Sequence, residues 1–170
     1  MRLVIDTNVY VSALLKETGK PASVVEYAAR GTKIIASPET WNEFVEVIGR
    51  PKFKPYVSRE RVAAFSGLVY RGTTMVSPRK KHFLSPDPKD NKFIDAAVEG
   101  RADAIVSGDR RHLLSLGRVM GIPVVSEPYA KVRPAPAMRQ KRDQNAQQRS
   151  VNSAFSPVFA GRKGTIRTFA

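Results

Sequence analysis

Carboxylates occur at four separate places in the chain where an α/β fold could bring them to one site. They are Asp6, Glu43, a group at 90–95 that contains Asp90, Asn91 and Asp95, and Asp109. Carboxylates that meet at close range repel one another, and a bound cation relieves this repulsion. The pattern therefore predicts a site for a divalent metal ion.

The residue types also indicate which metal would bind. The chain has no cysteine and two histidines, His82 and His112, which lie far apart in the sequence. We therefore interpret both histidines as structural or surface residues, and we interpret Asp87 and Asp103 as loop and strand-entry residues. An all-oxygen ligand set favours Mg²⁺ or Mn²⁺ over zinc. One or two such ions would lower the pKa of a bound water, orient a phosphate and stabilise a leaving oxygen.

Short apolar runs and amphipathic segments alternate along the chain and would position these acids. The runs that read as strands are 2–5, 33–36, 74–76, 104–106 and 123–125, and the helical segments are 9–15, 22–30, 38–48, 59–70 and 91–99. Plausible N-caps stand before four of the helices, at Asn8, Ser37, Ser58 and Asp90. Strands that alternate with helices predict an α/β fold, with a parallel sheet covered by helices on both faces.

Such a fold would gather the acids. Asp6 and Asp109 each follow a predicted strand, and the group at 90–95 begins a predicted helix. In a parallel sheet the carboxyl ends of the strands and the first turns of the following helices share one edge, where ligands bind. We expect the acidic side chains to meet at that edge.

The charge of the chain indicates a polyanionic partner. The formal net charge is +14, from 29 basic and 15 acidic residues, which favours nucleic acid. The loop residues Arg79, Lys80 and Lys81 are candidates for phosphate contacts. Basic residues around an acidic metal site are the arrangement expected of a metal-dependent nuclease.

The composition changes near residue 130, so we expect a folded domain over 1–130 and a basic tail over 131–170. The tail has nine basic residues and one acid, with apolar residues near its end that could dock on a surface or leave it disordered. No apolar run approaches the ~20 residues needed to span a bilayer, and the N-terminus does not resemble a signal peptide. These features predict a cytoplasmic protein that does not enter a membrane.

Four segments in order resemble the PIN domain. They are Asp6-Thr7-Asn8, the helix with Glu43, DPKDNKFIDAAV at 87–98 and ADAIVSGD at 102–109, supported by RPKF at 50–53 and DRRHLL at 109–114. More narrowly, they resemble the bacterial and archaeal branch that supplies toxins of toxin–antitoxin pairs. The resemblance covers about 1–128. It implies a three-layer α/β/α fold with a mostly parallel sheet, Mg²⁺- or Mn²⁺-dependent ribonuclease activity on RNA, and a protein antitoxin as partner.

The resemblance also assigns roles to single residues. It implies that Asp6 is the central metal ligand, Glu43 the second acid and Asp109 the fourth. For the third acid we expect Asp95, with Asn91 as its neutral companion and Asp90 as the alternative. Asn8 would orient Asp6, and Ser107 would contact the site from its backbone turn.

An alternative keeps the fold without the chemistry. On this hypothesis the chain is a basic nucleic-acid-binding module, and Asn91 marks a weakened or inactive site where many relatives carry aspartate. The family and the apolar residues of the tail are also compatible with a homodimer.

Overall fold

The computed structural model describes residues 1–126. The predicted tail, 131–170, lies outside these residues. Within the described part, no helix combines the length and apolar character that a membrane-spanning segment requires.

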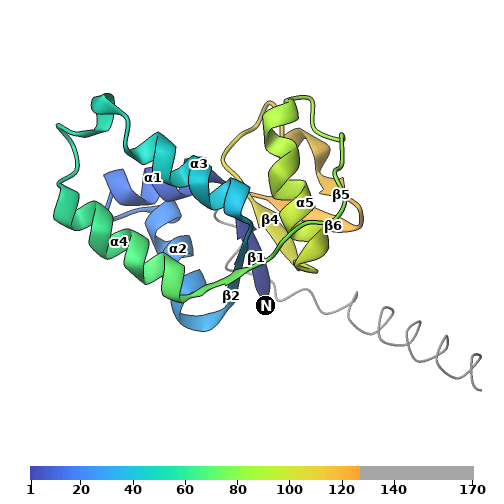
Figure 1. The fold of residues 1–170 in the computed structure, drawn as a ribbon, viewed down its shortest axis with the longest axis horizontal. Coiled ribbons are helices and arrows are strands. Elements are labelled where there is room, and N and C mark those ends of the chain that lie inside the picture. Colours follow the sequence, from blue (N-terminus) through green and yellow to red (C-terminus); the bar gives the residue numbers. More distant parts are fainter. Residues whose placement is uncertain (127–170) are drawn as a thin grey trace, which may run out of the picture. The chain divides into compact units, whose positions relative to one another are not determined.

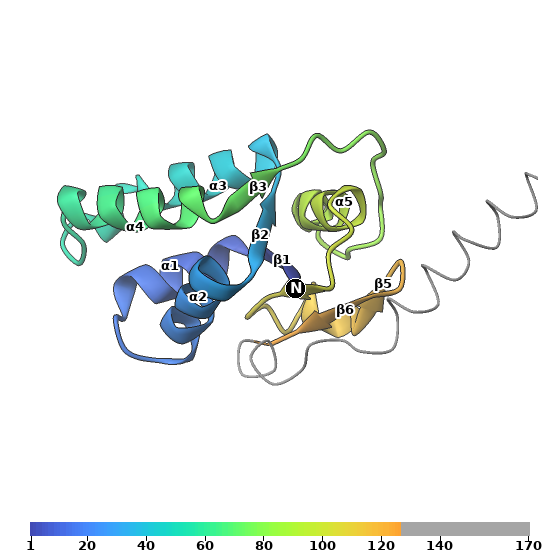
Figure 2. The same cartoon turned by 90° about the horizontal axis from the view of Figure 1, so that it is seen from below.

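A six-stranded sheet forms the centre of the fold, as Figures 1 and 2 show. Its strands lie in the order β3 (Thr73–Met75), β2 (Lys33–Ala36), β1 (Arg2–Ile5), β4 (Ala104–Val106), β6 (Ile122–Val125) and β5 (Arg118–Val119). All neighbouring pairs are parallel except β5 and β6, which are antiparallel. The predicted mostly parallel sheet is therefore confirmed, and only the short strand β5 was not expected.

The helices cover both faces of this sheet. They are α1 (Thr7–Leu15), α2 (Lys20–Gly31), α3 (Pro38–Ile48), α4 (Arg59–Arg71) and α5 (Asn91–Glu99), joined in part by the short 3₁₀ segments η1 (Pro51–Phe53), η2 (Pro88–Asp90) and η3 (Leu114–Leu116). Figure 2 shows α1–α4 on one side of the sheet and α5 on the other. The described residues thus form the predicted three layers.

The alternation of side chains along each strand produces two cores. Leu3 and Ile5 of β1 pack into the core with α1–α4, whereas Val4 between them packs into the core with α5. Successive side chains of a strand point to opposite faces, and both faces of this sheet are covered, so the strand is apolar throughout. The same division separates Ile34 from Ile35 on β2.

Two of the predicted helix caps differ from the observed ones. The side chain that caps α1 belongs to Asp6, which accepts a hydrogen bond from the backbone N–H of Asn8. Asp90 precedes α5 but makes no side-chain capping bond, while Asp87 caps η2 through the N–H of Lys89. The sequence pattern predicted a cap at Asp90 because it did not indicate the 3₁₀ turn η2 that precedes α5. The carboxylate of Asp90 is therefore not used to cap the helix.

Candidate metal site

The strands β1 and β4 are parallel neighbours, and their register places Asp6 at the carboxyl edge of the sheet beside Ser107. Ile5 pairs with Val106, and the N–H of Asp6 donates to the carbonyl of Val106 at 2.9 Å. The Asp6 side chain is 2% exposed. A carboxylate buried at this position needs compensation by hydrogen bonds or by a cation.

Hydrogen bonds compensate part of the Asp6 charge. Its Oδ2 accepts from Ser107 Oγ at 2.6 Å and from Asn8 Nδ2 at 3.3 Å, and its Oδ1 accepts from the Asn8 N–H at 3.3 Å. Burial nevertheless raises the pKa of Asp6, and the nearby charge of Glu43 adds to the rise, although the bonds from Ser107 and Asn8 oppose it. Asn8 thus contacts Asp6, the residue it was expected to orient, and Ser107 contacts Asp6 through its side-chain hydroxyl.

Ser107 also links Asp6 to Asp109. Its hydroxyl donates to Asp6 and accepts from the N–H of Asp109 at 2.9 Å. Asp109 Oδ2 lies 2.7 Å from His112 Nδ1, and Asp109 Oδ1 accepts from the N–H of Arg111 at 2.8 Å. Burial raises the pKa of Asp109, but the bonds from Arg111 and His112 outweigh this effect and lower it. Asp109 is therefore ionised and fixed beside Asp6.

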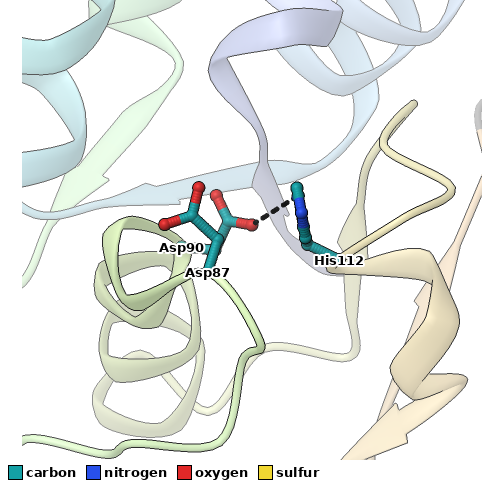
Figure 3. A group of neighbouring side chains, drawn as sticks. All are labelled: Asp87, Asp90 and His112. Carbon is teal, nitrogen blue, oxygen red and sulfur yellow. Dashed lines mark ion pairs between the residues drawn. The ribbon is translucent and has the colours of Figure 1, made fainter.

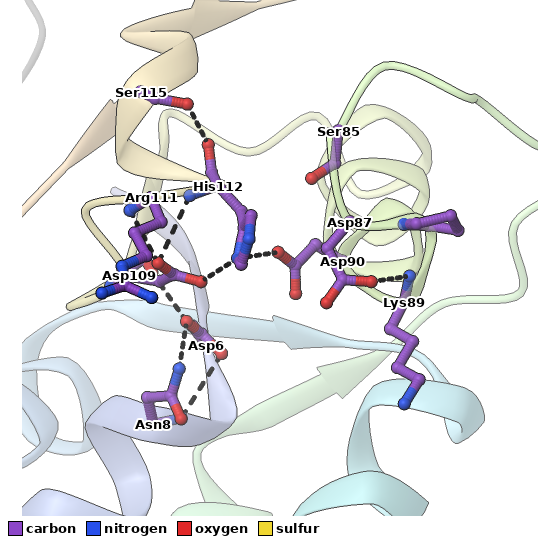
Figure 4. Close-up of polar contacts among 12 residues, drawn as sticks. Asp6, Asn8, Ser85, Asp87, Lys89, Asp90, Asp109, Arg111, His112 and Ser115 are labelled. Carbon is purple, nitrogen blue, oxygen red and sulfur yellow. Dashed lines mark hydrogen bonds and ion pairs between the residues drawn. The ribbon is translucent and has the colours of Figure 1, made fainter.

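Asp90 faces the same site from the start of α5. Its Oδ2 lies 3.9 Å from His112 Nδ1, and Figure 4 shows His112 between Asp109 on one side and Asp87 and Asp90 on the other. Burial, followed by the negative charges of Asp6, Asp87 and Asp109, raises the pKa of Asp90 to about 6. The buried Oδ2 atom of Asp90 has no hydrogen-bond partner among the described residues.

Glu43 reaches the site from α3. Its charge acts on Asp6, and its carboxylate forms an ion pair with Lys92 of α5. The two side chains are 25% and 21% exposed, respectively. The ammonium of Lys92 thus offsets the negative charge of Glu43.

Asp95 and Asn91 contact the loop 77–87 instead. Asp95 is 2% exposed, and its Oδ1 accepts from the His82 N–H and lies 2.8 Å from His82 Nδ1. Asn91 Oδ1 accepts from the N–H groups of Leu84 and Ser85, at 2.9 Å each. Neither residue is among the groups that shift the pKa of Asp6 or of Asp90.

Helix geometry explains the separation between Asp90 and Asp95. Asn91 and Asp95 are four residues apart and share one helical face, as expected, but that face is turned toward the loop. Five residues separate Asp90 from Asp95, which places them about 140° apart around the helix axis. The structure therefore brings Asp90, and not Asp95, to Asp6 and Asp109.

Sequence reasoning missed two residues of the site, Asp87 and His112. One ligand atom from each of Asp87, Asp90 and His112 lies within 4.8 Å of the other two (Figure 3). The signal that could have identified them is spacing: Asp87 precedes Asp90 by three residues, and Asp109 precedes His112 by three. Residues three apart on a helical turn are neighbours.

The three basic residues predicted to contact phosphate have different surroundings. The Lys81 ammonium lies 2.7 Å from Glu39 and 3.8 Å from Asp95, so it fastens the loop to α3 and α5. Arg79 and Lys80 are exposed, and their side chains form no ion pair with another described residue. Of the three residues, Arg79 and Lys80 therefore keep a positive charge that can bind a ligand, whereas Lys81 is already paired.

The donors present fit a hard divalent cation. The charge of Glu43 acts on Asp6, and the charges of Asp6 and Asp109 act on Asp90, at one edge of the sheet. The Oδ2 atom of Asp90, which has no hydrogen-bond partner among the described residues, is an acceptor that a cation would satisfy. Oxygen-rich sets of this kind suit Mg²⁺ and Mn²⁺. Among the described residues, Asp87, Asp90 and His112 are the group whose ligand atoms all lie within 4.8 Å of one another.

The raised pKa of Asp90 predicts opposite pH effects on folding and on metal binding. Between pH about 4 and about 6, native Asp90 retains a proton that the unfolded chain has lost, so the stability of the metal-free protein falls as the pH rises through this window. Metal binding needs the ionised carboxylate, so Mn²⁺ affinity should increase as the pH rises through 6.

Thermal unfolding in EDTA and calorimetric titration with Mn²⁺, both from pH 4.5 to 7.5, measure these two effects. The Asp90→Asn variant is the reference, because the other titrating groups are shared and largely cancel in the comparison. As the pH rises from 4.5 to 7.5, we expect the wild type to lose stability relative to Asp90→Asn in EDTA, and its Mn²⁺ affinity to increase more than that of the variant. Parallel curves for the two proteins would contradict the assignment.

The family model described as PIN domain matches residues 2–111. An uncharacterized protein of Methanocaldococcus jannaschii is 32% identical over 123 residues, which cover 68% of this chain and 75% of that protein. A chain in the crystal structure of VapBC2 from Rickettsia felis, bound to a DNA fragment from their promoter, superposes with a TM-score of 0.51 and 14% identity. That superposition covers 74% of this chain and 98% of the other.

Proposed function

The chain belongs to the PIN domain family, and we propose that it is a divalent-metal-dependent endoribonuclease. The observation that carries the proposal is the charge interaction of Asp90 with Asp6 and Asp109 at the carboxyl edge of the sheet, where a buried oxygen of Asp90 lacks a hydrogen-bond partner. A purely structural acidic cluster would be expected to pair its buried acceptors with donors of the chain.

The residues of the site have distinct roles in this proposal. Asp6, Glu43, Asp90 and Asp109 hold the metal, which when bound supplies a water of lowered pKa and charge stabilisation for the leaving oxygen. Asn8 and Ser107 fix the orientation of Asp6 through their hydrogen bonds. Such outer bonds hold a ligand in its binding geometry.

Cations at the rim of the site would hold the RNA backbone. Lys89, Arg110 and Arg111 are exposed and adjoin Asp90 and Asp109 in sequence, and Figure 4 shows Lys89 and Arg111 on opposite sides of the cluster. Arginine and lysine form charge-assisted hydrogen bonds to phosphate oxygens. The excess positive charge of the whole chain would favour the same polyanion.

His112 has a separate position between the acids. Its hydrogen bond to Asp109 raises the pKa of the imidazole. A protonated His112 would offer one more positive group to a phosphate beside Asp109. We assign it this supporting role and keep the metal on the carboxylates.

We further propose that the protein is the toxin of a toxin–antitoxin pair, that Mg²⁺ or Mn²⁺ is its metal and that it acts on RNA in the cytoplasm. The support for the toxin role is the likeness of fold to a chain of VapBC2 and the sequence motifs that resemble the toxin branch. The partner would be a protein antitoxin.

The alternative, a nucleic-acid-binding module with an inactive site, is less well supported. This alternative depended on the view that Asn91 stands in place of an acidic metal ligand. In the structure both polar atoms of the Asn91 amide are used by the backbone of 84–88, so the residue serves the loop. Asp90, beside it, supplies the missing carboxylate.

Cleavage of labelled single-stranded RNA by the purified full chain tests the proposal. We expect cleavage with Mg²⁺ or Mn²⁺, loss of cleavage in EDTA and recovery when the metal is restored, because the metal is required for the chemistry. Induced expression in a bacterial host should slow growth in parallel if the protein is a toxin. Salt-sensitive RNA binding without cleavage at any metal concentration would favour the inactive module. DNA of the same sequence serves as the comparison substrate.

A further inference from the structure

The loop 77–87, between β3 and η2, carries the most exposed large apolar side chain in the described part of the protein. Phe83 is 85% exposed. Its neighbour Leu84 is 44% exposed. Exposure of apolar surface to water is unfavourable. A ligand that covers Phe83 would therefore gain free energy from burial of this ring.

The backbone on both sides of Phe83 is fixed. The N–H of His82 donates to the buried Asp95 at 2.8 Å, and the N–H groups of Leu84 and Ser85 donate to Asn91 at 2.9 Å each. Both acceptors belong to α5 and are less than 10% exposed. Anchors on either side hold the Phe83 backbone on α5 while its ring remains in solvent.

This loop also leads directly into the acidic site. Ser85 is two residues from Asp87, and Asn91, which anchors the loop, follows Asp90. Figure 4 shows Ser85 on the side of the cluster formed by Asp87 and Asp90. Phe83 precedes Asp87 by four residues, on the loop that ends at the site proposed for cleavage.

The charges around Phe83 favour a nucleic acid over an apolar protein surface. Arg79, Lys80 and Lys89 are exposed, and within residues 1–126 their side chains take part in none of the ion pairs. Lys81 is occupied by Glu39. An exposed aromatic ring among unpaired cations can stack on a base while the cations contact the phosphates on either side.

We infer that Phe83 is a stacking platform for an unpaired base of the RNA and positions the strand beside the acidic site. The inference rests on the proposed function for its substrate. It adds a consequence for specificity: a stacked base must be free of its own helix, so the site takes single-stranded RNA and rejects the same sequence in a duplex. Every base has a face that can stack, so Phe83 contributes affinity with little sequence preference.

Binding of a fluorescent 12-nucleotide RNA to the full chain in EDTA tests the inference without cleavage. We expect Phe83→Ala to weaken binding about fivefold or more, with no change in the slope of log affinity against log salt, because no phosphate contact is lost. Phe83→Tyr keeps a stacking ring and should bind like the wild type. Tyr56→Ala is the matched control, since Tyr56 is 74% exposed on a different basic loop, between η1 and α4.

Kinetics in Mg²⁺ separate this inference from the proposed function. Phe83→Ala should raise KM with little change in kcat, because stacking binds the substrate and the transition state alike. Unchanged binding and unchanged KM in a folded Phe83→Ala protein would overturn the inference while leaving the nuclease intact. If Phe83→Ala impairs only neutralisation by an antitoxin, the inference is also overturned, because Phe83 would then contact a protein and not RNA. If the wild type binds through Phe83 but cleaves nothing, the inference stands and the nuclease proposal fails.

Discussion

Replacing Asp90 by asparagine is expected to slow metal-dependent RNA cleavage by about 1,000-fold or more, whereas the same change at Asp95 is expected to leave the rate within about threefold of the wild type. Asp90 Oδ2 is buried, lacks a hydrogen-bond partner and lies 3.9 Å from His112 Nδ1, and the charges of Asp6 and Asp109 act on the Asp90 carboxyl. An amide in its place loses the charge that a divalent ion requires. Asp95 directs its carboxylate to His82 and Lys81.

Single-turnover cleavage at pH 7.5 with saturating Mn²⁺ measures both variants. Asp6→Asn provides the reference for complete loss, because Asp6 is the residue on which the other contacts converge. Asp87→Asn tests whether the second aspartate at the margin of the site is also needed. A large loss in Asp95→Asn together with an active Asp90→Asn would reverse the assignment and favour the sequence-based expectation for the third acid.

The difficulty with the third acid shows what sequence patterns can determine. Apolar runs located the strands that end just before Asp6 and Ser107, because a strand buried on both faces is apolar throughout. The shared edge of parallel strands then placed Asp109 near Asp6. Both steps depend on local pattern and on the general geometry of α/β sheets.

The orientation of α5 depends on its contacts with a loop, which sequence periodicity does not reveal. Periodicity shows that Asn91 and Asp95 share a face but cannot show what that face contacts. The loop 77–87 contains Pro78, Pro86 and several basic residues, and its path is set by hydrogen bonds to those same two side chains. A strand or helix pattern does not encode such a path. His112 was missed for the same reason, since its position depends on the turn after β4.

These contacts give α5 two functions at once. Asp90 immediately precedes its first residue and faces the acidic site, and one face of the helix holds the loop that carries Phe83. The proposed metal ligand and the proposed stacking residue are therefore fixed to the same helix. A substitution that loosens the loop would disturb the RNA contact and would leave the acids themselves in place.

Asp95→Ala should show this directly through the stability of the fold. The substitution removes two hydrogen bonds from His82 to a carboxylate that is 2% exposed, and it leaves the His82 N–H without its acceptor. Bonds to a buried charged group contribute about 1.5–3 kcal/mol each before relaxation, so we expect the free energy of unfolding to fall by about 2–4 kcal/mol. Asp95→Asn keeps one oxygen for the His82 N–H and should lose less.

Urea unfolding of the full metal-free chain, followed by circular dichroism, measures the change. Glu39→Ala is the matched control. Glu39 lies on α3 and is the exposed ion-pair partner of Lys81, which belongs to the same loop as His82. Exposed ion pairs contribute about 0–1 kcal/mol. If Asp95→Ala were no less stable than Glu39→Ala, the buried bonds could not be what fastens the loop. With the expected difference, Asp95→Ala should also bind single-stranded RNA more weakly than Asp95→Asn, because the loop that carries Phe83 would no longer be held on α5 through His82.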